Sequence, residues 1–173
     1  KKNFEKATLH LVDENYPEAL KIFNTLLSEQ PGNTNLNFLI GLCYVKSPTS
    51  RKEAIGFLEK AVTGTTPDYT EGDYKQEKAP AYVLRYLAEA YHLSDQFEMA
   101  METYRIYKTM IKPNQSEILN EIDRQIRICE NAVKMMKNPV NVKISNLGEQ
   151  INSEFAEYAP LISADESIII FTS

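Results

Sequence analysis

Apolar residues recur every three or four positions along most of this chain, the spacing that places them on one face of an α-helix. The stretch 82–113 is the clearest case, because a polar break at residues 94–96 separates two apolar sets. These sets are Leu84, Leu87, Ala88 and Tyr91, then Phe97, Ala100, Met101, Tyr104 and Tyr107. They predict two helices back to back, which cross closely at the small side chains of Ala88 and Ala100. Pro113 is expected to end the second helix, because its ring has no N–H for the helical ladder.

The same pattern occurs twice more. The step along the chain from Ala7 to Ala19 equals the step from Ala88 to Ala100. The first copy continues through Phe23, Leu26 and Pro31. The second copy lies between the first copy and the stretch 82–113. Its step from Gly41 to Ala54 is one residue longer than the other two steps, and Pro48 lies in its turn. Its members are Ile40, Gly41, Tyr44, Ala54, Leu58 and Ala61.

The spacing therefore predicts three helical pairs and one longer helix. The pairs are 2–12 with 16–30, 34–46 with 51–63, and the two halves of 82–113. The longer helix lies in the segment after Pro113, from Asn114 to Asn138, with one apolar stripe formed by Ile118, Ile122, Ile126, Cys129, Val133 and Met136. Such a terminal helix covers the apolar edge that the last pair leaves open.

Two segments depart from the helical pattern. Residues 64–78 lose the apolar period and gather Gly, Pro, Thr and Asp, which is typical of a loop. This insertion either carries binding residues or simply packs Tyr69 and Tyr74 against the next helix. After Pro139, the alternation of Val140, Val142 and Ile144 and the final run SIIIFTS both indicate β-strands. The fold class expected is all-α with a short β segment, divided into domains at 1–138 and 139–173.

Composition narrows the possible functions. The chain has 173 residues, 43% of them hydrophobic and 25% charged, as in ordinary soluble proteins. Its 24 acidic against 19 basic residues give a net charge of −5, which argues against a nucleic-acid partner. No apolar run approaches the roughly 20 residues that span a bilayer, so no direct membrane span is expected. The start, KKNFEKA, has neither Met nor an apolar signal core, which indicates a trimmed fragment.

Reactive side chains are few. Cys43 and Cys129 have neither metal nor redox spacing and lie in apolar stripes, so we expect both to be buried. His10 and His92 are the only histidines, and each lies in the first helix of a pair. A packing or groove-lining role is expected for both, because no nucleophile, base and metal ligands gather around them. The sequence predicts a protein that is not an enzyme and holds no cofactor or metal.

The repeated pattern resembles the tetratricopeptide (TPR) repeat, a helical hairpin of about 34 residues. Leu87, Ala88 and Tyr91 stand for its L-G-x-x-Y signature, Ala100 for its alanine and Pro113 for its closing proline. The step from Ala19 to Ala54 is close to this period, whereas the step from Ala54 to Ala100 is longer and contains the insertion. The resemblance implies a solenoid of three repeats plus a capping helix, because one repeat cannot bury its own apolar face.

In a TPR solenoid the first helix of each pair lines a concave groove that binds a protein or peptide. The resemblance therefore implies a partner-binding groove in which aromatic residues and arginine are the expected anchors. About a third of its residues are expected to be inter-repeat core. The predicted groove residues are Phe4, Thr8, Leu11, Asn35, Phe38, Leu42, Val45, Tyr82, Arg85, Glu89 and His92.

Cytosolic TPR co-chaperones are the alternative class. Their grooves bind a terminal carboxylate of a heat-shock protein with Lys, Asn and Arg side chains. The corresponding positions here are Phe4, Thr8, Leu39, Tyr82 and Tyr86, so the carboxylate clamp is absent. This disfavours a co-chaperone.

The end of the chain resembles the opening of a WD-like β-propeller blade. Such propellers follow TPR arrays in envelope proteins of Bacteroidetes-type bacteria, with the pattern E-Y-x-P-x-x-S-x-D-G. The matching residues are Glu157, Tyr158, Pro160, Ser163, Asp165, Phe171 and Ser173, whereas Ala156 and Glu166 depart from the pattern. This implies a truncated first blade after residue 139 and a periplasmic lipoprotein associated with the outer membrane and with type IX secretion or gliding. Any contact with peptidoglycan would belong to an OmpA-like domain absent from this fragment.

Overall fold

The computed structural model describes residues 1–47, 51–143, 145, 146, 148, 152, 158–165 and 167–172. The chain is mostly helical, with a small two-stranded sheet near its C-terminus. It forms two compact units, Lys1–Asn138 and Pro139–Ser173. The expectations placed on Pro48, Ile144, Ala156, Glu157, Glu166 and Ser173 lie outside the described residues.

The described part of the first unit contains seven α-helices. These are α1 (Lys2–Val12), α2 (Tyr16–Glu29), α3 (Thr34–Lys46), α4 (Ala54–Val62), α5 (Val83–His92), α6 (Phe97–Met110) and α7 (Ser116–Lys137). Residues Arg51–Glu53 form a 3₁₀ turn, η1, instead of the first turn of the predicted helix 51–63. Pro31, Pro113 and Pro139 each follow shortly after a helix end, as expected for residues that cannot continue the backbone ladder.

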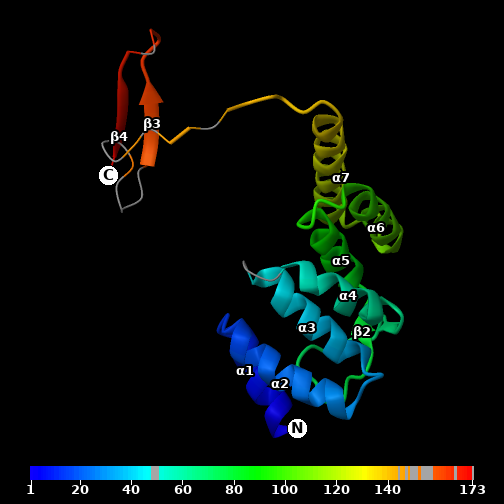
Figure 1. The fold of residues 1–173 in the computed structure, drawn as a ribbon. Coiled ribbons are helices and arrows are strands. Elements are labelled where there is room, and N and C mark those ends of the chain that lie inside the picture. The colour runs from blue at the N-terminus through cyan, green and yellow to red at the C-terminus, as the bar shows by residue number, and fades with distance from the viewer. Residues whose placement is uncertain are drawn as a thin grey trace. The chain divides into compact units, whose positions relative to one another are not determined.

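Each helix packs mainly against the helices before and after it in the sequence (Figure 1). Contiguous helix pairs, from α1 with α2 to α6 with α7, account for the extensive helix contacts among the described residues. Small side chains lie where the two helices of a pair meet, and the alanines among them have no exposed surface. These alanines are Ala7, Ala19, Ala54, Ala88 and Ala100.

The turns between α1 and α2 and between α5 and α6 have the same backbone conformation. Glu14 and Asp95 both adopt the left-handed conformation, with φ of 56° and 60°. The next residue in each turn, Asn15 or Gln96, donates its N–H to the carbonyl of His10 or Tyr91, at 2.8 and 2.9 Å. The two turns therefore repeat one structure, and the spacing along the chain from Glu14 to Asp95 equals the spacing from Ala7 to Ala88.

The second pair replaces alanine with glycine at its crossing. A Cβ atom on Gly41 would lie 2.5 Å from Leu58 Cγ and 2.6 Å from Leu58 Cδ2, closer than packed carbon atoms approach. The fully buried Leu58 of α4 therefore occupies the space above Gly41 of α3. This contact fixes how closely the two helices pack.

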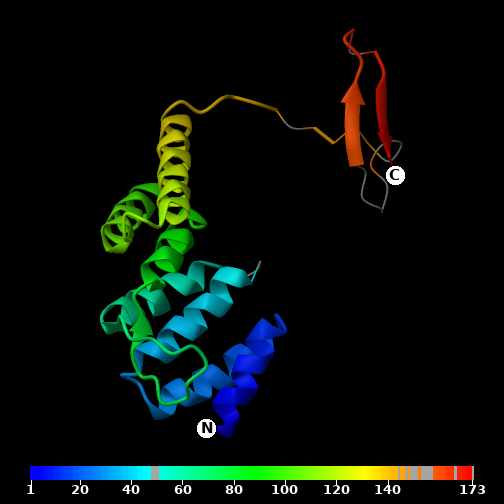
Figure 2. The same ribbon diagram turned by 180° about the vertical axis from the view of Figure 1, so that it is seen from behind.

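The insertion between α4 and α5 folds back to the start of α3 (Figure 2). Its ends pair as two short parallel strands, β1 (Thr65–Thr66) and β2 (Ala79–Pro80). Thr34 connects them, because its hydroxyl donates to the Gly64 carbonyl at 2.5 Å and accepts from the Ala79 N–H at 3.1 Å. The predicted loop thus has a fixed base on α3.

The second unit contains an antiparallel hairpin of β3 (Tyr158–Ile162) and β4 (Ile169–Thr172). The pairing is irregular between Tyr158 and Leu161, where Ala159 has a φ of 50°. Asp165 holds the turn, since it accepts hydrogen bonds from the Ser163 and Ser167 hydroxyls at 2.5 and 2.9 Å. These bonds lower the pKa of Asp165 to about 2.

The prediction of a strand that begins at Val140 is wrong for residues 140–143, the part of it that the structure describes. Val140–Lys143 have no regular structure, and the Val140 and Val142 side chains are mostly exposed. An alternating pattern needs a second strand to complete its backbone hydrogen bonds, and no described residue pairs with this segment. The strand predicted in SIIIFTS is confirmed as β4.

The glycine contact gives a stability prediction with an internal control. Gly41→Ala places a methyl group against Leu58, and we expect it to lower the free energy of unfolding by about 1–3 kcal/mol, the usual cost of overpacking. Gly56→Ala lies on the exposed face of α4 with nothing within 4 Å, so it is expected to raise that free energy by about 0.5–1 kcal/mol. Urea denaturation followed by circular dichroism measures both. Equal effects of the two substitutions would contradict the close crossing.

Candidate binding groove

A cavity of about 430 Å³ opens between α1, α3, α5 and the insertion. We call it the first cavity. Its walls are mainly apolar and aromatic, with acidic and basic groups at a few positions. The lining residues that the argument uses are Leu11, Glu14, Phe38, Lys46, Tyr69, Glu71, Tyr82 and Tyr86.

Four aromatic rings pack together along this cavity, and we call Phe38, Tyr69, Tyr82 and Tyr86 the aromatic cluster. The Phe38 ring lies at the centre, with centroids 6.3 Å from Tyr69, 5.7 Å from Tyr82 and 5.9 Å from Tyr86. Edge-to-face pairs at such distances are favourable. Phe38 is only 2% exposed, whereas Tyr82 is 37% exposed. The accessible surface of the aromatic cluster therefore comes from the tyrosines, and the buried Phe38 ring packs against all three of them.

The insertion contributes Tyr69 to this cluster through a buried polar contact. The Tyr69 hydroxyl donates to Asn35 Oδ1 at 2.9 Å, and Asn35 Nδ2 donates to the Gln76 carbonyl at 3.0 Å. The Asn35 backbone N–H also donates to the Glu77 carbonyl at 3.0 Å. Because Asn35 is 1% exposed, losing these bonds would leave buried polar atoms unpaired. The loop is thus held as part of the cavity wall.

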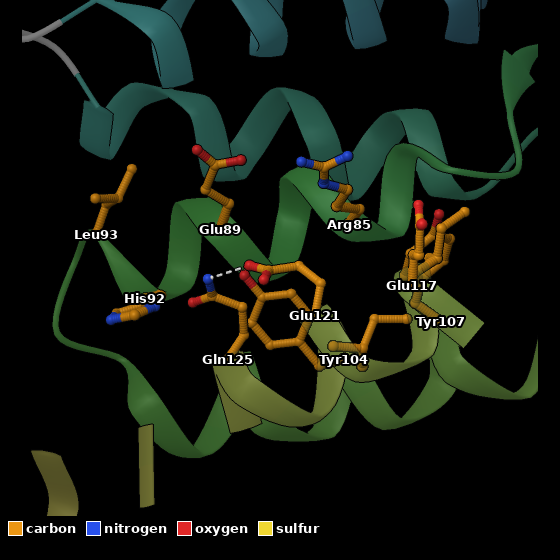
Figure 3. Close-up of a pocket in the computed structure, with 11 residues that line it drawn as sticks. Arg85, Glu89, His92, Leu93, Tyr104, Tyr107, Glu117, Glu121 and Gln125 are labelled. Atoms are coloured by element: carbon orange, nitrogen blue, oxygen red, sulfur yellow. Dashed lines mark hydrogen bonds between the residues drawn. The ribbon is translucent and has the colours of Figure 1, made fainter. Parts of the chain in front are cut away.

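A second cavity, of about 440 Å³, lies between α5, α6 and α7. Figure 3 shows side chains from all three helices around it, with Gln125 hydrogen-bonded to Glu121. Tyr104 and Tyr107 come from α6, and Glu117, Ile118, Glu121 and Ile122 come from α7. Helix α7 therefore also forms a wall of this cavity, besides covering the last pair.

Helix α5 lines both cavities. Tyr86 and the N-cap residue Tyr82 line the first cavity, and Arg85 and Glu89 line the second. Two contacts connect a residue of the first cavity with a residue of the second. Lys46 Nζ lies 3.9 Å from Glu89 Oε1, and the Tyr86 ring centroid lies 5.8 Å from the Arg85 guanidinium. The two cavities thus adjoin along α5, and together we call them the groove.

Burial, nearby charges and hydrogen bonds shift the pKa values of several side chains that line the groove. Burial, with a smaller contribution from Glu71, raises the pKa of Tyr82 to about 12. The pKa of Tyr69 is also raised, by burial and then by the neighbouring Tyr82 and Glu71. Hydrogen bonds from Arg124 and Gln125 lower the pKa of Glu121 to about 2. At neutral pH Tyr69 and Tyr82 are therefore neutral phenols, and the Glu121 carboxyl is ionised.

The structure places nine of the eleven predicted groove residues along the two cavities. Phe4, Thr8, Leu11, Phe38, Leu42 and Tyr82 line the first cavity, and Arg85, Glu89 and His92 line the second. Asn35 and Val45 line neither cavity, and both are buried in the core, with 1% and 3% exposure. Asn35 instead anchors the insertion.

Several groove residues were not among those predicted. Tyr69 and Glu71 come from the insertion, where the sequence offered aromatic and acidic residues without a helical period to orient them. Tyr104, Tyr107 and Glu121 come from α6 and α7, which a groove of first helices alone does not include. Cys43 and Cys129 are buried and unpaired, as predicted.

No protein-family model matches the chain, and no curated protein matches it. Within the described ranges, no group of three His, Cys, Asp or Glu side chains is arranged to hold a metal ion. No helix in the described part of the chain is both long and apolar enough to cross a membrane.

The raised tyrosine pKa values predict a specific loss of stability at alkaline pH. In the unfolded chain these phenols ionise near pH 10, whereas folded Tyr82 holds its proton to about pH 12. This contribution to stability is therefore complete below pH 10 and is lost as the pH rises toward 12. We expect Tyr82→Phe to make the loss between pH 10 and 12 shallower, as measured by urea denaturation. Tyr74→Phe, in the insertion but outside the aromatic cluster, is the control, and identical pH profiles for wild type and Tyr82→Phe would contradict the assignment.

Proposed function

We propose that the first unit is a TPR-type solenoid of three helical hairpins, closed by α7. Three observations support this. Consecutive helices pack against one another, the first and third pairs share one turn conformation, and small residues lie at equal positions in the crossings. A stack of this kind exposes the first helix of each pair on one side, and residues of the first helices α1, α3 and α5 line the first cavity.

We propose that the protein is a non-enzymatic scaffold that binds a segment of a partner protein in this groove. The observation that carries the proposal is the aromatic cluster, because its tyrosines line an open cavity with part of their surface accessible. Aromatic residues supply much of the binding energy in protein interfaces, since their large rings bury apolar area at low entropic cost. A helix or an extended peptide fits a trough of this kind.

The groove surface disfavours recognition of a terminal carboxylate, the function of cytosolic TPR co-chaperones. Tyr82 and Tyr86 occupy positions where such proteins carry basic groups, and Glu71 adds negative charge nearby. A carboxylate needs paired cationic donors to offset its loss of hydration. An internal segment of a partner protein is therefore the better candidate.

By resemblance, we propose a periplasmic location next to the outer membrane, in a secretion or gliding apparatus. We also propose that β3 and β4 belong to a larger sheet of the propeller type. The support is their exposed apolar surface, since an isolated two-stranded hairpin is marginal in water. The exposed residues include Leu161, Ile162, Ile168 and Ile170.

Truncation of an exposed groove tyrosine tests the proposed function. With the immobilised chain as bait in an envelope extract, we expect Tyr82→Ala to reduce capture of its partner about ten-fold, the effect of losing an interface anchor. Met99→Ala removes a side chain of comparable exposure from α6 outside both cavities and should leave capture unchanged. Circular dichroism verifies that both variants stay folded. Undiminished capture by Tyr82→Ala would show that the groove is not the binding surface.

Phe38→Ala is a poorer test, although Phe38 lies at the centre of the cluster. Its burial means that truncation would cost about 3–5 kcal/mol of folding free energy, so lost capture would follow from unfolding alone. Tyr86→Ala is the better second variant, since Tyr86 lines the same cavity and is only partly buried.

A further inference from the structure

We propose that the first cavity accepts a basic side chain, Lys or Arg, from the bound partner segment. This inference rests on the proposed function and specifies the chemistry of the partner. The first cavity combines accessible aromatic rings with two carboxylates, Glu14 and Glu71, that form no ion pair with the described residues. That combination suits a side chain with an apolar stem and a positive end.

Two carboxylates of the first cavity lack an ionic partner within the described part of the chain. Glu14 lies in the turn after α1 and Glu71 in the insertion, and both are exposed. None of the ion pairs formed by the described residues involves either of them. Lys46, the cation that lines this cavity, is already 3.9 Å from Glu89 and 5.7 Å from the Tyr86 ring centroid. The negative charge of Glu14 and Glu71 is thus left for a ligand.

Two aromatic rings of the first cavity likewise have no cationic partner among the described residues. Among the described residues, Tyr86 contacts both Lys46 and Arg85 through its ring, whereas no cation lies over Tyr69 or Tyr82. Glu71 is close enough to Tyr69 and Tyr82 for its charge to raise the pKa of both phenols. A basic side chain lying over these rings would bring its charge near Glu71.

The second cavity is also lined by more acidic than basic residues. Glu89, Glu117 and Glu121 line it, against Arg85 and His92. Glu89 is 3.9 Å from Lys46 and Glu121 is 2.8 Å from Arg124, whereas none of the ion pairs among the described residues involves Glu117. A partner segment that follows α5 from one cavity to the other therefore meets carboxylates along its length. Complementary charge steers association and rejects acidic segments, which would have to approach like charges.

Competing occupants fit less well. An acidic segment would face Glu14 and Glu71 directly. A wholly apolar segment would cover these carboxylates without giving them a partner, which costs free energy because they lose water. Only a positively charged side chain can both stack on the Tyr69 and Tyr82 rings and offset the charges of Glu14 and Glu71.

Selection from a random library tests this chemistry without knowing the partner. The whole chain is immobilised and used to select from phage-displayed random dodecapeptides at low salt. We expect the selected pool to be enriched in Lys and Arg, and the tightest peptide to bind less well as salt rises. Its affinity is then measured by fluorescence anisotropy for wild type and variants.

Two double variants carry matched charge changes. Glu14→Gln with Glu71→Gln removes both groove carboxylates, and we expect about a five- to ten-fold loss of affinity, the effect of losing two partly exposed charge contacts. Asp13→Asn with Asp68→Asn removes two exposed charges from the same turn and insertion but not from the cavity lining, and should change affinity less than about two-fold. Tyr82→Ala locates binding in the groove.

The outcomes separate this inference from the proposed function. If selected peptides require Tyr82 but are neutral or acidic, or if both double variants weaken binding equally, the basic occupant is wrong and the binding groove stands. If no peptide is enriched, or if Tyr82→Ala has no effect on binding, the groove itself is wrong, and this inference fails with it.

Discussion

The close crossing of two helices within each pair is the constraint on which the rest of this structure depends. At each crossing the side chain is reduced to a methyl group or a hydrogen, as at Ala7, Gly41 and Ala88. This brings the backbones close enough for larger residues, such as Phe23 and Leu58, to become fully buried between them. A pair built in this way still has an apolar edge, which only the next helix can cover. The sequential stack, and the groove along it, follow from that requirement.

Most of the helical architecture could be predicted from the sequence, because helix spacing, small residues and prolines are local signals. The helices begin and end within a few positions of the predicted bounds, and proline follows the ends of α2, α6 and α7. The strand predicted after Pro139 was wrong where it is described, since alternation specifies a face but not a pairing strand. Strand pairing is a long-range property that a single segment does not encode.

The groove was less predictable, because it depends on which residues tertiary contacts bury. Asn35 and Val45 share a helix with the cavity residues Phe38 and Leu42, and all of α3 is apolar enough to hide which side faces the groove. Asn35 is buried because the insertion supplies its hydrogen-bond partners, Tyr69 and Gln76, which are distant from it along the chain. Tyr69 enters the groove through the same contact. No local pattern records such an interaction.

The insertion can vary in sequence without altering the helix crossings. Thr34 and Asn35 hold its two ends and its tyrosine from the start of α3, so the helices do not depend on the identity of its outer residues. Substitutions or changes of length near Glu71 can alter the charge and shape presented to a ligand while leaving the helix crossings intact. Under the proposed function, changes confined to the insertion would alter which segments bind while the helical scaffold stays the same, in the way that antibody loops diversify on a constant framework.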